Sequence, residues 1–183
     1  MKRSTWTAVL LLCLAVAASP AAAQERYTFT VGVLGGVGGS ADSSDGGVFD
    51  GGSLQVNLGM ITNVRTHVVL RLGRLDLDGE EGIYEGLDDA QLEYFNVAGE
   101  YRFDQGYYDF GMYLGLGSYK LKGSPLPGEK EGETALGGVF GIDGDFDITR
   151  HFSIIAEGSA HYAFFDDHST IYVTAGAGVA FHF

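Results

Sequence analysis

The chain has 183 residues, of which 45% are hydrophobic and 13% aromatic, and it carries 24 acidic against 11 basic side chains. The length suits a single domain with a sizeable core, and the aromatic content excludes a disordered chain. A net charge of −13 argues against nucleic-acid binding, which needs Lys and Arg to neutralise phosphates. Twenty-nine glycines leave room for few long helices, so we expect an all-β protein.

The first 23 residues have the three parts of a secretory signal peptide. Lys2 and Arg3 supply a basic start, residues 8–18 form an apolar run too short to span a bilayer, and three alanines then offer a cleavage site. We therefore assign residues 1–23 to a signal peptide and residues 24–183 to the mature domain.

A lipoprotein anchored through Cys13 is the alternative interpretation of this segment. Cys13 lies inside the apolar run, however, and follows Leu12, where a lipid-attachment motif needs a small residue. Cys13 is also the only cysteine, so we expect an exported chain without disulfides.

Eight segments of the mature chain alternate with period two between apolar residues and small or polar ones, as strands do. They are residues 27–34, 54–60, 67–73, 94–103, 108–117, 136–146, 152–162 and 171–183. Short connections near 62–65, 104–106 and 147–150 alternate with longer polar ones at 40–52, 78–89, 122–133 and 165–169. Transmembrane strands need only about 9–11 residues each. The pattern therefore predicts an eight-stranded antiparallel up-and-down transmembrane β-barrel.

Side-chain volume indicates which face of the strands is outside. An eight-stranded barrel has an interior only wide enough for side chains to fill. One face of the segments carries most of the large aromatic residues, whereas the other carries most of the glycines with Ser, Thr, Asn and charged groups. We therefore expect small and polar residues to line the lumen and apolar residues to face lipid, with an aromatic girdle beside the short connections.

These features resemble the small bacterial outer-membrane barrels of the OmpA/OmpX type. The chain shares with them the Ala-x-Ala signal peptide, the eight alternating strands and a last strand, IYVTAGAGVAFHF, that ends on an aromatic residue. The resemblance implies an outer-membrane location, with both termini periplasmic and the long connections extracellular. In that family the terminal aromatic and the alternating hydrophobic residues before it are recognised by the barrel-assembly machinery, which implies this role for Val179, Phe181 and Phe183.

A set of charged residues falls on the expected inner face. Arg71, Glu100 and Glu157 lie at similar heights on three strands, so we predict that Arg71 bridges one or both carboxylates. Arg102 should pair with Asp109 or Asp145 nearer the short connections. The expected interior network consists of Arg71, Glu100, Arg102, Asp109, Asp143, Asp145, Glu157 and His161.

The acids of the segment DGDFD, residues 143–147, could also suggest a cation site. An interior acid usually pairs with a base, and Arg71, Arg102 and His161 also point inward. We therefore favour a salt-bridge network over a metal site and expect no cofactor.

The segment HFSIIAE offers His151, Ser153 and Glu157, which resemble the H-x-S motif of lipid A deacylase barrels. The functional interpretation is a Ser nucleophile, a His base and a Glu that orients it. Glu157 belongs to the inner face at mid-barrel, however, whereas a deacylase triad must face lipid at the outer leaflet. The residues that flank that family's motif are also missing, so we expect no enzyme activity.

The long connections and the strand ends beside them hold 16 of the 24 acidic residues. Exposed acids keep loops soluble and resist aggregation, which we take as their first role. They could also bind Mg²⁺ or Ca²⁺ that bridges to lipopolysaccharide phosphates, with Arg74, Lys120 and Lys122 at the strand ends as direct phosphate contacts.

Two function classes stay open. The protein is either a non-enzymatic structural or surface-interaction protein, or a narrow porin-like channel whose lumen passes small solutes. The inward charges should plug so narrow a barrel, which favours the first. We expect a monomer whose partners are outer-membrane lipid, lipopolysaccharide and the assembly machinery.

Overall fold

The computed structural model describes residues 29–41, 49, 51–63, 65–77, 88–104, 108–124, 133–165 and 169–183. The predicted signal peptide and most of the long acidic connections lie outside these residues. Within the described ranges all regular structure is β-strand, and no helix there is long and apolar enough to cross a membrane.

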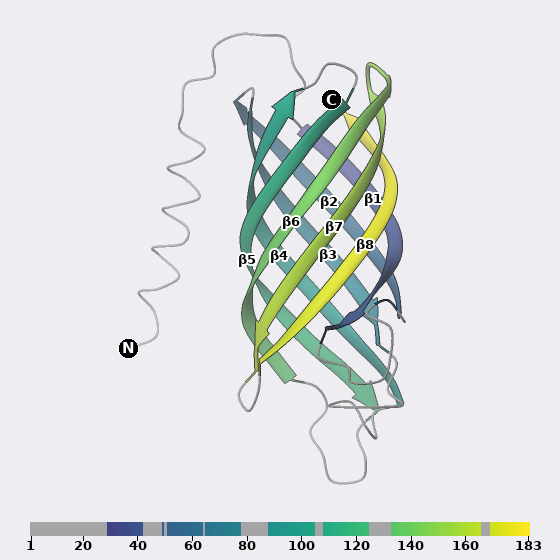
Figure 1. Ribbon diagram of the computed structural model, residues 1–183, viewed down its shortest axis with the longest axis vertical. Helices are drawn as coiled ribbons and strands as arrows, with labels where there is room; N and C mark the ends of the chain where they lie inside the picture. The colour runs from purple at the N-terminus through teal and green to yellow at the C-terminus, as the bar shows by residue number, and fades with distance from the viewer. Residues whose placement is uncertain are drawn as a thin grey trace, which may run out of the picture.

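Eight antiparallel strands form one closed barrel, which confirms the predicted fold (Figure 1). Each strand pairs with the next along the chain, and the last pairs with the first. The strands are β1 (Phe29–Ser40), β2 (Gly51–Asn63), β3 (Thr66–Asp76), β4 (Asp88–Asp104), β5 (Tyr108–Ser124), β6 (Glu133–Thr149), β7 (Phe152–Phe164) and β8 (Ser169–His182).

The two ends of the barrel differ in the length of their connections. The brief links β2–β3, β4–β5 and β6–β7 lie at the end where β1 begins and β8 ends, which we call the short-turn end. Phe29 and Phe183 close the seam there, because the backbone nitrogen of each donates to the carbonyl oxygen of the other at 3.0 Å. We call the opposite end the long-connection end.

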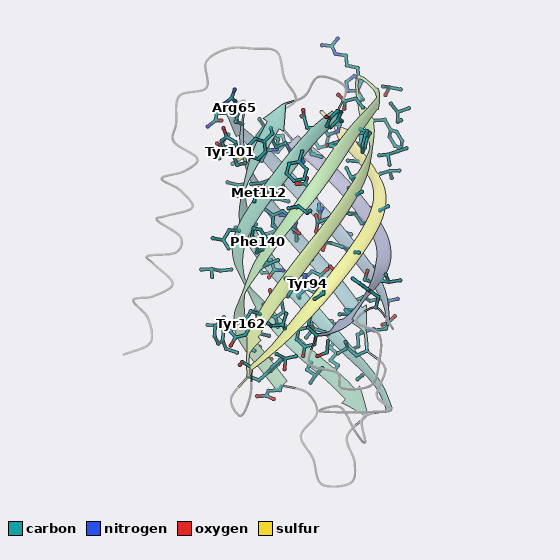
Figure 2. All side chains as sticks on the ribbon, in the orientation of Figure 1. Arg65, Tyr94, Tyr101, Met112, Phe140 and Tyr162 are labelled. Atoms are coloured by element: carbon teal, nitrogen blue, oxygen red, sulfur yellow. The ribbon has the colours of Figure 1, made fainter. Side chains whose placement is uncertain are left out.

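The outer surface is apolar, as the volume argument predicts. Large hydrophobic side chains from all eight strands are exposed on it, and Figure 2 shows Met112 and Phe140 projecting outward at mid-height. Aromatic rings cluster near the short-turn end, where Tyr101 lies 5.0 Å and Phe110 lies 6.0 Å from Phe103 between ring centroids. This belt is the expected interfacial girdle.

The interior is less polar than the sequence pattern predicts. At the long-connection end it is filled by apolar residues and tyrosines that form one buried cluster: Leu75, Leu77, Ala90, Leu92, Tyr94, Tyr119, Leu121, Ala135, Ala163, Phe165 and Tyr172. The expectation of a small and polar lumen was therefore wrong for this end.

An inversion of polarity along the strands explains both this cluster and the strands that extend past their predicted ends. Beyond the lipid-facing band, outward positions of β4 and β5 carry Glu93, Lys120 and Lys122, while the inward positions carry leucines. Residues still alternate with period two, but the apolar residues now occupy the inner face and the charged residues the outer face. A strand prediction that requires the apolar residues to stay on one face therefore ends β4 and β5 too early.

Inward tyrosines occupy the space that glycines leave on neighbouring strands. Tyr94 faces Gly73 across the β3–β4 pair, and Tyr113 faces Gly141 across the β5–β6 pair. A Cβ added at either glycine would lie 2.3 Å from the tyrosine ring. These glycines therefore let aromatic rings lie flat against the barrel wall.

Candidate functional site

The centre of the lumen is an ion-pair cluster around Arg71. Its Nη2 donates to Glu100 Oε2 at 3.1 Å, and its Nε donates to Glu157 Oε2 at 3.3 Å. The Arg71 side chain is only 1% exposed, and its Cζ lies 3.5 Å from the centroid of the Tyr113 ring. The structure thus places a guanidinium from β3 between carboxylates from β4 and β7.

A second cluster around Arg102 adjoins the first on the side of the short-turn end. Arg102 Nε donates to Glu100 Oε1 at 2.5 Å, so Glu100 is shared by both arginines. The other Arg102 nitrogens contact Asp143 Oδ2 at 2.9 Å and Asp145 Oδ2 at 3.3 Å. Asp109 lines the same space and lies opposite Asp145 in the β5–β6 register.

Neutral side chains outside the predicted network complete the Glu157 environment. Gln55 Nε2 and the Tyr113 hydroxyl each donate to Glu157 Oε1 at 2.8 Å, and Asn57 Nδ2 donates to Oε2 at 3.3 Å. Alternation already assigns all three residues to the inner face. Their contact with Glu157 depends on the stagger between distant strands, which alternation does not give.

His161 lies apart from the ion pairs, in a layer nearer the long-connection end. Its Nε2 is 2.8 Å from Ser159 Oγ, and its Nδ1 is 3.2 Å from the Tyr119 hydroxyl. The Tyr94 ring lies 4.6 Å from the imidazole, and the Tyr94 hydroxyl donates to Gln55 at 2.6 Å. The structure therefore brings His161 to tyrosines and a serine, and not to the carboxylates with which it was grouped.

A cavity of about 320 Å³ occupies the half of the lumen nearer the short turns. Its wall includes both arginines of the two clusters and a group of carboxylates. His67, which is not part of the predicted network, also lines it and has its Nδ1 3.7 Å from Glu100 Oε1. The cavity therefore ends against the Arg71 cluster.

Ser153 does not form a catalytic triad with His151 or Glu157. Ser153 is fully buried in the lumen, with its Oγ 2.8 Å from His182 Nε2, while His151 is exposed and stacks on Phe181. His182 also has Asp145 Oδ2 3.7 Å away, but at the same nitrogen. A triad needs the acid and the nucleophile on opposite imidazole nitrogens, and Nδ1 of His182 faces Thr30 Oγ1 at 3.0 Å.

An outward-facing charged patch lies at the long-connection end of β3, β4 and β5. Arg74 is opposite Glu93 in the β3–β4 register, and Glu93 is opposite Lys120 in the β4–β5 register. Lys122 forms an ion pair with Glu93, and both side chains are partly exposed. Three basic groups therefore meet one carboxylate just beyond the lipid-facing Leu72 and Phe95.

Three outward residues of the C-terminal segment share one face. Val179, Phe181 and Phe183 are all exposed, and the rings of Phe181 and Phe183 lie 6.0 Å apart. The Phe183 ring also lies 6.0 Å from that of Phe29. The C-terminal aromatic is thus part of the girdle at the seam of the barrel.

Comparison with known proteins supports the same fold. The chain matches the family profile of the outer membrane protein beta-barrel domain over residues 8–183. No curated protein sequence matches it.

Three solved structures are similar to the barrel. The crystal structure of Neisserial surface protein A has a TM-score of 0.64 at 17% identity, over 87% of this chain and 100% of that one. The N-terminal barrel domain of OprF from Pseudomonas aeruginosa has a TM-score of 0.60 at 12% identity, with coverage of 87% and 100%. A major outer membrane protein from Thermus thermophilus has a TM-score of 0.60 at 16% identity, also with coverage of 87% and 100%. At these identities the solved structures show the fold alone. Because the family profile covers most of the chain, the chain belongs to the outer membrane β-barrel protein family.

Proposed function

We propose that this protein is a non-enzymatic outer-membrane barrel with a closed lumen and a structural or surface-interaction role. The observation that carries the proposal is the Arg71 cluster, in which a buried guanidinium binds Glu100 and Glu157 across the middle of the lumen. Opening a path there means separating buried ion pairs, which is costly because each charge would lose its partner.

A second layer of buried side chains supports closure. Tyr94, Tyr119 and His161 pack together next to the Arg71 cluster, and both tyrosines belong to the buried cluster that fills the long-connection end. A solute would have to pass the ion-pair layer and then this packed layer of tyrosines and apolar side chains. The cavity near the short turns would then be a recess reached from one end.

A liposome-swelling assay tests the closed lumen against the channel alternative. The folded barrel is reconstituted into liposomes, which are diluted into isotonic solutions of small sugars and amino acids. We expect swelling no faster than in protein-free liposomes. Swelling that rises with the amount of protein and falls with solute size would support a porin-like channel instead.

We further propose that the short-turn end is periplasmic and that the long connections face the cell exterior. The short-turn end carries the aromatic girdle and the C-terminal Phe183, and the opposite end carries the longer, acid-rich connections. A protease added to intact cells should cleave within the long connections. Cleavage only after the outer membrane is broken would contradict this orientation.

The charged patch of Arg74, Lys120 and Lys122 fits contact with the phosphates of lipopolysaccharide. These basic groups lie just beyond the apolar band, at the depth where lipid headgroups begin. Glu93 pairs with Lys122, and the exposed Asp76 lies in the next row, where it accepts a hydrogen bond from Gln91. Replacing Lys120 and Lys122 by glutamine should weaken lipopolysaccharide binding by purified barrel. Arg65→Gln at the opposite end is the matched control, and an equal loss in both variants would contradict a specific patch.

A further inference from the structure

We propose that Asp145, Asp147 and His182 form a binding site for a divalent transition-metal ion at the short-turn mouth of the lumen. Each residue offers one ligand atom, and these atoms all lie within 4.8 Å of one another. His182 Nε2 and Asp145 Oδ2 are 3.7 Å apart. Two ligand atoms at bonds of about 2.1 Å around a tetrahedral ion lie roughly 3.4 Å apart, so the imidazole and this carboxylate are close enough to share an ion. Because Oδ2 contacts Arg102, Oδ1 is the oxygen of Asp145 that is left to bind it.

The second observation is a buried carboxylate oxygen without a partner. Asp145 is only 6% exposed, and it lines the cavity. Its Oδ2 contacts Arg102, whereas its Oδ1 has no hydrogen-bond partner among the described residues. Such oxygens are costly unless a cation or donor reaches them, which points to a ligand at this wall.

The charge of the cavity points the same way. Its lining includes six carboxylates but only two guanidiniums, those of Arg71 and Arg102, among the residues that the structure describes. Together, the two arginines already bind four of these six carboxylates. Asp147 makes no ion pair with any residue of the described ranges, so a divalent cation at the mouth would offset part of the excess negative charge.

The mixture of ligands selects the class of ion. Imidazole together with carboxylate oxygens suits Zn²⁺ and similar transition metals, whereas Ca²⁺ and Mg²⁺ prefer oxygen ligands alone. Asp145 and Asp147 lie on β6 and His182 on β8, on either side of β7. A bound ion would therefore tie the C-terminal strand to β6 and stabilise the mouth of the barrel.

Ser153 supplies a control within the same site. Its Oγ lies 2.8 Å from His182 Nε2 and would turn away when that nitrogen binds the ion. Ser153→Ala therefore removes a competing contact without removing a ligand. Asp76→Asn, at the opposite end of the barrel, is a control for loss of one exposed carboxylate.

The test is calorimetric titration of Zn²⁺ into the untagged barrel folded in detergent micelles. We expect one saturable site in the unchanged protein, which Asp147→Asn and His182→Gln each weaken by at least about tenfold. Ser153→Ala and Asp76→Asn should keep it. Zn²⁺ should also raise the unfolding temperature of the unchanged protein, but not of Asp147→Asn, because an ion that binds only the folded state stabilises it.

Three results would overturn the proposal. One is the absence of saturable Zn²⁺ binding in the unchanged protein, or a Zn²⁺ affinity that Asp147→Asn leaves unchanged. Another is full Zn²⁺ affinity in His182→Gln, which would remove the imidazole from the ligand set. The third is Ca²⁺ binding as tight as that of Zn²⁺ at the site that Asp147→Asn weakens.

Discussion

Replacing Arg71 by methionine should destabilise the barrel by about 3–5 kcal/mol, because it leaves buried carboxylates without their cation. Methionine keeps an unbranched side chain in the lumen but loses the bonds to Glu100 Oε2 at 3.1 Å and Glu157 Oε2 at 3.3 Å. The contact between the guanidinium and the Tyr113 ring is lost as well.

The two carboxylates should not contribute equally to this loss. Glu100 keeps Arg102, whose Nε lies 2.5 Å from its Oε1. Glu157 keeps only neutral donors, since Arg71 is its one ion-pair partner among the described residues. Most of the cost should therefore come from Glu157, and Arg71→Met/Glu157→Gln should recover most of the lost stability. Arg71→Met/Glu100→Gln should recover little, because Glu157 stays charged and unpaired.

Urea unfolding of the barrel in detergent micelles, followed by far-ultraviolet circular dichroism, measures these differences. With an m value of about 2 kcal/mol/M, a loss of about 4 kcal/mol lowers the urea midpoint by about 2 M. Replacing Arg71, Glu100 and Glu157 together by neutral residues should also cost much less than the single change. The reasoning is refuted if Arg71→Met costs less than about 1 kcal/mol, or if the Glu100 change restores stability and the Glu157 change does not.

Three further changes test the seam, the girdle and the glycine contacts. Phe183→Ala should lower the yield of assembled barrel in the outer membrane, measured as heat-modifiable protein on gels. The change keeps the backbone bonds to β1, so a normal yield would contradict an assembly role for the ring. Phe181→Asp should reduce stability in lipid by less than a charge at mid-bilayer would, because this outward position lies beside the interfacial girdle. Urea unfolding in vesicles checks it against the unchanged protein. Gly141→Ala should lower the free energy of unfolding by roughly 1–3 kcal/mol, because its Cβ would lie 2.3 Å from the Tyr113 ring. Gly99→Ala, with no atom within 4 Å of its Cβ, should leave the urea midpoint nearly unchanged.

The sequence predicts the barrel well because strand alternation and side-chain volume are local properties. Eight alternating segments and a narrow interior are enough to place Arg71, Glu100 and Glu157 in the same lumen. In a space only a few side chains wide, opposite charges at similar heights have few other partners.

Other features depend on the stagger between strands, which alternation does not determine. His161 lies one layer away from the carboxylates, so that its neighbours are Tyr94, Tyr119 and Ser159. His182 lies near Asp145 because β6 and β8 both pair with β7, and the stagger across these two pairs sets the contact. A shift of strand register by two residues would keep every side chain on its face and change these partners.

The apolar layer at the long-connection end was missed for a different reason. Leu75, Leu92 and Leu121 occupy inner positions where the outer positions have left the lipid and become charged. The hydrophobic residues therefore move from the outer to the inner face within a single strand. Only the depth of the membrane boundary, which no single strand encodes, reveals that such leucines line the lumen.

Ion conductance across a planar lipid bilayer tests the closed lumen most directly, because inorganic ions are the smallest species that a continuous aqueous path would admit. The folded barrel is added to one side of the bilayer, and insertion is verified by the heat-dependent gel mobility of protein recovered from the membrane. We predict no conductance above that of protein-free bilayers, since the Arg71 cluster and the buried cluster of tyrosines and apolar residues lie in series. Reproducible current steps whose number rises with the protein added would contradict the account and favour the narrow channel.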